Sequence, residues 1–362
     1  MKDVEFFKIK LSDKEHETIR SNFVEHKKFI NKNIAIARKK SKGTYCKYCE
    51  KETSSYCNSH SLPAFCLRNI SSKGLVLSIN QLVDFPLMDF EKGVNKAGTF
   101  HLICRECDSK IFREYENPEA YINKPTTKML AQIAMKNCLR YIGKRLEEKS
   151  IFELIGDQNK NVIDFVDSMH EVQSLDLDEY EKEFNKAKKI SKKNFGDEYY
   201  LFFHEKLDYV VPIAFQSSIA LVVDLDNNII NDIYCNDPNY KIYGLHVCIF
   251  PLEDSSIIML FIDSKHQKRY RSFYKKFNRL SLDDKLSIIN YIVFLYSEDV
   301  FLSKEIPKEI LENENLISTA QTTLMAVNFS FSKSTTEAAK ETYNLNNHKI
   351  IPNLLSEKNK LK

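Results

Sequence analysis

Cys46-Lys-Tyr-Cys49 and His101-Leu-Ile-Cys104-Arg-Glu-Cys107-Asp108 decide how the N-terminal part of this 362-residue chain folds. Each stretch contains a C-x-x-C knuckle, which places two thiolates at about 2.3 Å from a zinc ion without strain. Two knuckles complete the tetrahedron that zinc prefers. We therefore predict one structural Zn²⁺ held by Cys46, Cys49, Cys104 and Cys107, and the odd number of nine cysteines does not indicate a disulfide framework.

The residues between the knuckles offer a second set of zinc ligands. Cys57-Asn-Ser-His60 follows the first knuckle, and Cys46, Cys49, Cys57 and His60 would also satisfy a tetrahedral ion. That choice leaves the two cysteines of the second knuckle without a role, so the four-cysteine site is the preferred prediction. His60 is then available for another task, although a histidine near cysteines is often a zinc ligand or a capping residue.

The region around His60 resembles the HNH, or ββα-metal, endonucleases that carry a zinc knuckle frame. Their signature is a C-x-x-C pair, a histidine that precedes a proline by three positions, and a second C-x-x-C pair followed by a polar residue that opens a helix. The stretch Ser59-His60-Ser61-Leu62-Pro63-Ala64-Phe65 is similar to a bacterial subgroup of this family, and Asp108 follows the second pair. The resemblance is confined to the zinc unit and does not extend to residues 150 to 362.

The resemblance implies hydrolysis of phosphodiester bonds in nucleic acid, DNA in preference to RNA. His60 would be the general base for the attacking water, and Asp108 would help to bind a catalytic Mg²⁺ or Mn²⁺ ion. An imidazole is a competent base near neutral pH, and a carboxylate oxygen suits a hard cation. Both carboxylates also have a non-catalytic explanation. The helix dipole favours a carboxylate at Asp108 whether or not it binds metal, and Glu116 would be a solvated residue on the same helix.

Two positions depart from the family pattern. Many members have an acidic metal ligand directly before the histidine, where this chain has Ser59. They also have an asparagine shortly before the second knuckle, where this chain has Thr99, with Asn95 and His101 as the nearest substitutes. An inactive zinc module that binds nucleic acid, or a regulatory or protein-interaction module, is therefore the alternative hypothesis.

Cationic residues gather in two places. Arg38-Lys39-Lys40-Ser-Lys42 precedes the first knuckle and would hold phosphates beside a nuclease cleft, the alternative being a solvated loop. The stretch from Lys265 to Arg279 is also basic, but its aromatic residues fall at the spacing of a buried helix face. We predict that these aromatics, Tyr270, Phe273, Tyr274 and Phe277, belong to the core, with the cations outside.

The composition limits the class of protein. A net charge of +3 excludes a histone-like polycation, so any nucleic-acid contact must come from local patches. The N-terminus lacks a secretory signal, and no apolar run approaches the ~18 residues of a membrane span, so we expect a cytoplasmic protein without a membrane role. The sequence contains no Walker loop, dinucleotide fingerprint or nucleophile elbow, which disfavours nucleotide hydrolysis and acyl transfer.

The predicted fold class is α+β, with a helical lead-in at 1–43 and a zinc-binding, HNH-like ββα-metal module with a packing helix at 44–150. A helical linker at 151–195, an α+β domain at 196–325 and a partly mobile tail at 326–362 follow. The second domain should form an antiparallel sheet from runs at 199–203, 209–215, 219–223, 229–234, 243–250 and 256–262. Helices at 265–278 and 282–296 should follow it. By analogy with prokaryotic antiphage defence, this domain would sense a signal or bind a partner protein.

Overall fold

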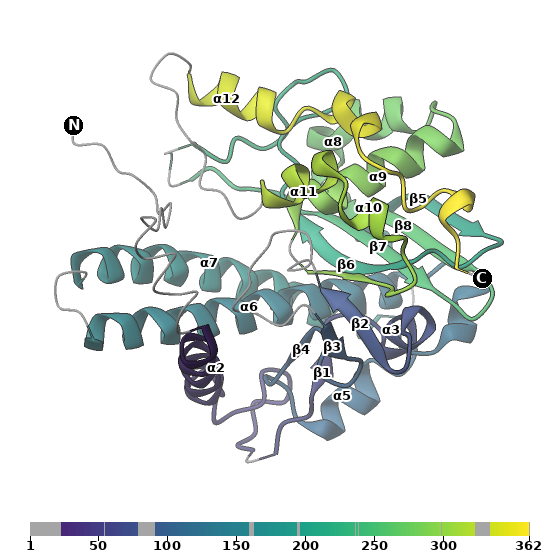
Figure 1. Ribbon diagram of the computed structural model, residues 1–362. Coiled ribbons are helices and arrows are strands. Elements are labelled where there is room, and N and C mark those ends of the chain that lie inside the picture. The colour runs from purple at the N-terminus through teal and green to yellow at the C-terminus, as the bar shows by residue number, and fades with distance from the viewer. Residues whose placement is uncertain are drawn as a thin grey trace.

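The computed structural model describes residues 23–53, 55–78, 91–158, 163–193, 196–235, 237, 239–297, 299–322 and 334–361. The fold is α+β, as predicted (Figure 1). Its helices are α2 (Phe23–Lys40), α3 (Ala64–Ile70), α5 (Arg105–Ile111), α6 (Thr127–Gln158), α7 (Ile163–Ile190), α8 (Gln267–Phe277), α9 (Leu282–Tyr296), α10 (Lys308–Leu311), α11 (Glu314–Gln321) and α12 (Thr335–Thr342). Its strands are β1 (Ser59–His60), β2 (Leu75–Ser78), β3 (Glu91–Gly93), β4 (Thr99–Phe100), β5 (Tyr199–Leu207), β6 (Ile213–Ile219), β7 (Leu245–Pro251), β8 (Ser256–Asp263) and β9 (Val300–Leu302). Short 3₁₀ helices are η1 (Pro118–Tyr121), η3 (Ser264–His266), η4 (Leu345–Ile350) and η5 (Glu357–Asn359).

A seven-stranded antiparallel sheet organises the molecule, in the order β3-β2-β9-β6-β7-β8-β5. Successive side chains of a strand point to opposite faces of a sheet, and in the central strands the side chains of both faces are buried. In β7, Val247 and Ile249 join one hydrophobic core, whereas Cys248 and Phe250 join the other. Each face of the sheet therefore needs a layer of helices to cover it.

Strands from both predicted domains share this sheet. β2 and β3, which lie between the two cysteine knuckles, pair with it through β9, where Leu77 is opposite Leu302. β9 follows α9 in sequence and pairs on its other side with β6. The predicted zinc-binding region, residues 44 to 120, is called the zinc unit below, and these backbone hydrogen bonds attach it to the main sheet.

Helices cover the two faces of the sheet (Figure 1). α8 and α9 supply one core, in which Tyr270, Phe273 and Phe277 of α8 are fully buried, as predicted. Tyr274, which was predicted with them, is only partly buried against this core. α6 and α3 belong to the other core, together with the zinc unit. α6 and α7 lie side by side and extend well beyond the sheet, so the predicted linker consists of the end of α6 and of α7.

The predicted strands at 219–223 and 229–234 are wrong. Apart from Ile219, which ends β6, these residues form a loop with one isolated bridge, between Val223 and Ile229. Its polar groups bond within the loop: the Asp224 carboxylate accepts the N–H groups of Asp226 and Asn228, and the Asn231 amide donates to Leu221 O. Side chains that satisfy the backbone in this way compete with a strand ladder.

The described part of the predicted tail, residues 334–361, packs against the rest of the fold. Leu345, Leu354 and Leu355 are fully buried in the core that contains α9. The Asn290 side chain of α9 donates to Pro352 O and accepts from Leu354 N. The composition of this segment is polar, but a few leucines are enough to attach it, because burying each leucine side chain stabilises the fold by about 1.5 to 3 kcal/mol. No described helix combines the length and apolar character needed to cross a bilayer.

A buried ion pair attaches α6 to the segment before β9. Asp299 is almost fully buried, and the Arg140 guanidinium donates to its carboxylate at 2.7 Å, with the Lys144 ammonium 3.4 Å away. Burial raises the pKa of Asp299, but the two cations lower it by more, so that this pKa lies well below its usual value.

We expect Asp299→Asn to destabilise the protein by about 3 to 5 kcal/mol at pH 7, because it leaves two cations without their partner. A carboxyl with a depressed folded-state pKa stabilises fully above the unfolded value of about 3.9 and loses this contribution as pH falls toward the folded value. Denaturant unfolding should therefore show a difference between wild type and variant that is constant from pH 7 to 5 and shrinks below about pH 4. Asp226→Asn, which breaks an exposed pair with Lys276, should cost under about 1 kcal/mol at every pH.

Candidate metal centre and the adjoining ionic cluster

The zinc unit contains two strands followed by a helix. β1 pairs antiparallel with β4, so that His60 is opposite Thr99, and α5 starts directly after Cys104. Gly98, in the turn before β4, has a φ of +63°, and a Cβ there would lie 2.7 Å from Ser61 Oγ. The turn therefore requires glycine, and it brings the Gly98 carbonyl to the Ser61 N–H.

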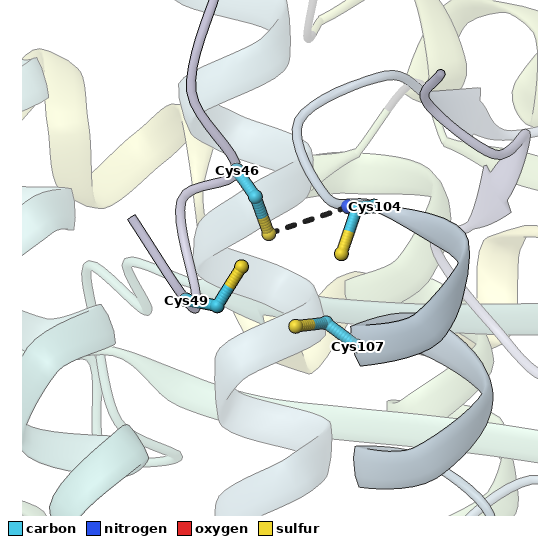
Figure 2. A group of neighbouring side chains, drawn as sticks. All are labelled: Cys46, Cys49, Cys104 and Cys107. Atoms are coloured by element: carbon cyan, nitrogen blue, oxygen red, sulfur yellow. Dashed lines mark hydrogen bonds between the residues drawn. The ribbon is translucent and has the colours of Figure 1, made fainter. Parts of the chain in front are cut away.

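The four cysteines of the two knuckles converge on one point (Figure 2). Their sulfur atoms all lie within 4.8 Å of one another, which is close enough to share one metal ion. The second knuckle is held beside the first because Cys104 N donates to Cys46 Sγ at 3.3 Å and Lys47 N donates to Leu102 O at 2.9 Å. Among the described residues, the alternative set with Cys57 and His60 does not form such a group.

The acid–base properties of these thiols suit a cation. Burial disfavours the Cys46 thiolate, but backbone N–H groups that point at its sulfur lower its pKa to about 7. Burial raises the pKa of Cys104 and of Cys107, and negative charge on Cys46 raises them further. A divalent ion between the four sulfurs removes this mutual repulsion and deprotonates the thiols.

His60 lies outside the group of four cysteines. Its Nε2 is 3.0 Å from the carbonyl oxygen of Val94, so Nε2 carries the proton and Nδ1 has the free lone pair. Burial lowers the pKa of His60, which keeps the imidazole neutral. The positive charge of Lys136 also lowers this pKa, whereas the negative charges of Glu116 and Asp108 raise it.

A lysine ammonium occupies the centre of these side chains. Lys136 of α6 has a fully buried side chain, and its Nζ donates to Ser59 Oγ and Asp108 Oδ1 at 2.9 Å and to Glu116 Oε1 at 3.0 Å. These bonds use all three of its protons. The Phe112 ring lies 4.1 Å from the same nitrogen, which adds a cation–π contact. We call Lys136, Ser59, Asp108 and Glu116 the ionic cluster.

Asp108 is bound tightly within the ionic cluster. Besides Lys136, it accepts a hydrogen bond of 2.6 Å from Ser59 Oγ. Burial raises the pKa of Asp108, but Lys136 and the Ser59 hydroxyl lower it by more, so the group is a carboxylate. The neighbouring Cys57 stays a thiol, because burial and the charge on Asp108 raise its pKa to about 12.

This arrangement does not fit a catalytic Mg²⁺ or Mn²⁺ ion. The resemblance assigns Asp108 and the position of Ser59 to such an ion, and both side chains are bound to the Lys136 ammonium instead. A divalent ion about 4 Å from an ammonium is repelled by roughly 8 kcal/mol at an effective dielectric constant of about 20. The residues therefore accept an ammonium in the place where the resemblance predicts a metal ion.

The other predicted substitutes lie apart from the ionic cluster. Thr99 Oγ1 donates to Lys96 O in its own turn, and Asn95 is exposed. His101 Nε2 lies 2.6 Å from Asn58 Oδ1, in the loop before β1. Glu116, which was interpreted as a solvated helix residue, is a member of the ionic cluster through its bond with Lys136.

The predicted phosphate-binding residues are accessible. Arg38, Lys39, Lys40 and Lys42 are all exposed at the end of α2 and just after it. Arg38 makes one exposed ion pair, with Glu147 at 3.4 Å. Lys47, which lies within the first knuckle, pairs with Glu181 of α7 and is thus less available to a phosphate. We call Arg38, Lys39, Lys40 and Lys42 the α2 basic cluster.

Comparison of the chain with protein-family models, with curated proteins and with solved structures found no match.

Proposed function

We propose that the zinc unit is a nucleic-acid-binding module in which the Lys136 ammonium replaces the divalent ion of the HNH endonucleases that it resembles. On this proposal the chain holds one structural Zn²⁺ and binds DNA in preference to RNA. It does not hydrolyse phosphodiester bonds by a divalent-ion mechanism.

Zinc is the ion that best suits the four-cysteine group. Four thiolates from two C-x-x-C knuckles match its tetrahedral preference, and a closed four-ligand set is typical of structural rather than catalytic sites. Mg²⁺ and Ca²⁺ prefer oxygen ligands, which none of these side chains supplies.

The ionic cluster carries the proposal that metal-dependent hydrolysis is absent. Its cation, the Lys136 ammonium, is part of the protein and has no exposed surface. It donates its three hydrogen bonds to Ser59, Asp108 and Glu116. A phosphate could reach this ammonium only after the cluster breaks, and a metal ion only after the lysine leaves. Breaking such a buried pair costs about 3 to 5 kcal/mol.

The α2 basic cluster supports the nucleic-acid role. It lies a few residues before Cys46 and is exposed, whereas Lys47, the cation within the first knuckle, is paired with Glu181. Each phosphate contact by a lysine or arginine releases a counterion, so such binding weakens as salt rises.

We expect the triple variant Lys39→Gln, Lys40→Gln and Lys42→Gln to bind labelled duplex DNA more weakly than wild type. The slope of log K against log salt should fall by about 2 to 3, because each lost phosphate contact contributes roughly 0.9. Fluorescence anisotropy at several salt concentrations measures this slope. The matched control is the triple variant Lys275→Gln, Lys276→Gln and Arg279→Gln, which removes three exposed cations from the end of α8 and the turn after it and should leave the slope unchanged.

The same protein should be incubated with plasmid, single-stranded DNA and RNA in Mg²⁺ or Mn²⁺. Binding without cutting is the expected result. Metal-dependent cutting that disappears in His60→Ala would contradict this proposal. It would support a metal-dependent endonuclease in which a divalent ion displaces Lys136.

One observation favours a second candidate function, phosphodiester cleavage without a divalent ion. His60 is neutral and keeps an unprotonated Nδ1, as a general base requires. Cutting that persists in EDTA and is lost in His60→Ala would identify this activity.

A further inference from the structure

A cavity of about 520 Å³ lies between the α6–α7 helix pair and one end of the main sheet, away from the ionic cluster. Its volume falls in the range of roughly 300 to 1,000 Å³ that is usual for sites that bind small molecules. Cys138 and Tyr141 of α6, Tyr180 of α7, Tyr199 of β5 and His246 of β7 line its interior. Neither the zinc unit nor the proposed nucleic-acid role uses any of these side chains.

A chain of hydrogen bonds fixes the proton on His246. Gln216 Nε2 points to two oxygen atoms, Ile133 O at 3.5 Å and Asn137 Oδ1 at 2.9 Å. Since Asn137 uses its oxygen to accept from Gln216, its Nδ2 is the atom that faces His246 Nδ1, at 3.0 Å. His246 Nδ1 is therefore the acceptor, and the ring carries its proton on Nε2.

The protonated nitrogen of His246 is available to a ligand. The ring stacks on Phe261 at 4.4 Å and lines the cavity while keeping part of its surface accessible. Burial lowers the pKa of His246 to about 3, so it presents a neutral N–H donor. No described residue hydrogen-bonds this Nε2 or the hydroxyl groups of Tyr180 and Tyr199.

The cavity lining is electrically balanced. Its deepest carboxylate, Asp263, pairs with the Lys186 ammonium, and Arg145 pairs with Asp176 at 2.7 Å. The exposed Glu183 also lies near Lys186, at 3.6 Å. The remaining charged side chains at the mouth, Glu179, Lys182 and Lys241, are of both signs and exposed. A ligand thus gains nothing from a large net charge, in contrast to a phosphate on the α2 basic cluster.

We propose that this cavity is a binding site for a nucleoside, an uncharged molecule whose planar base is rich in hydrogen-bond acceptors. The imidazole N–H of His246 and the hydroxyl of Tyr199 donate to the ring nitrogens or carbonyl oxygens of the base. The Tyr180 ring, which lines the cavity and stacks on Tyr141 at 5.1 Å, offers its other face to the base.

Titration calorimetry of the full chain with adenosine, guanosine, cytidine and uridine tests this proposal, with tyrosine and tryptophan as planar comparators. At least one nucleoside should bind one site per chain in the micromolar to low millimolar range. Tyr199→Phe, which removes only the hydroxyl, should weaken that binding about tenfold. Tyr209→Phe is the matched control, because its hydroxyl donates to Leu355 O on another part of the fold and its loss should leave the affinity unchanged.

His246→Phe supplies an independent test, since it keeps a ring against Phe261 and deletes the donor. Circular dichroism establishes that the variant is folded, and Tyr199→Phe carries the test alone if it is not. The proposal is overturned if no nucleoside binds, if the amino acids bind as tightly, or if the folded variants bind nucleosides as well as wild type does. Nucleosides lack phosphate, so these outcomes do not depend on the α2 basic cluster or on the proposed nucleic-acid role.

Discussion

Cys104→Ser is expected to abolish metal binding and to unfold the zinc unit. The reason lies in α5, which starts at this knuckle and has no fully buried side chain of its own. A short helix without a core depends on the ion, and structural zinc sites in small peptides contribute about 10 to 16 kcal/mol. Metal analysis should fall from about one zinc per chain to none, and the thermal midpoint should fall by about 10 °C or more.

Cys235→Ser is the matched control for this loss. Cys235 is an exposed cysteine in a loop far from the knuckles, so its replacement should change neither the zinc content nor the midpoint. Cys57→Ser distinguishes the two ligand sets, because it should retain the metal if the four knuckle cysteines hold it. A Cys104→Ser protein that folds and keeps its zinc would contradict the four-thiolate assignment.

The metal centre could be predicted from sequence because its information is local. Each C-x-x-C knuckle fixes the geometry of two ligands within four residues, so only the pairing of Cys46 and Cys49 with Cys104 and Cys107 required the fold. The helices α8 and α9 could be predicted equally well, because three of the four aromatic residues in the stripe of α8 are buried and the Ser281 side chain caps the start of α9 by accepting the N–H of Asp284.

The path of the main sheet could not be predicted in the same way. β9 is only three residues long and separates β2 from β6, although β2 lies far away in sequence. Nothing in the three residues Val300, Phe301 and Leu302 specifies these neighbours, because pairing between distant strands is decided by the packing of whole layers. The two loop segments predicted as strands failed for a related reason, since Asp224 and Asn231 bind the backbone locally.

The ionic cluster was not predicted, because Lys136 lies in α6, outside the segment that contains the cysteine and histidine motifs. The available signal was in α6, where residues 129–139 are all buried and yet include Gln132, Lys136 and Asn137. A helix that is buried all round must supply partners for each polar side chain. Lysine is almost never fully buried unless it is paired, so Lys136 within an apolar helix indicates two or more acceptors nearby.

Lys136→Met is expected to destabilise the protein by about 3 to 5 kcal/mol in denaturant unfolding. Methionine has a similar volume, so the loss arises from Asp108 and Glu116, which are left without their cation. Lys128→Met is the matched control on the same helix: Lys128 pairs with Glu114 at 2.9 Å on the surface, and its loss should cost under about 1 kcal/mol. Equal effects of the two substitutions would contradict a stabilising role for the buried ammonium.

Lys136→Ala should create the divalent-ion site that wild type lacks. The substitution vacates the centre of the ionic cluster and leaves Asp108, Glu116 and Ser59 to offer oxygen ligands to Mn²⁺. Electron paramagnetic resonance titration should detect one additional bound Mn²⁺ in the variant and none at this site in wild type. Adding Asp108→Asn to Lys136→Ala should remove that ion again. If wild type already binds Mn²⁺ and Asp108→Asn abolishes it, the lysine does not take the place of the ion, because a buried ammonium and a divalent cation cannot share the same carboxylate oxygen.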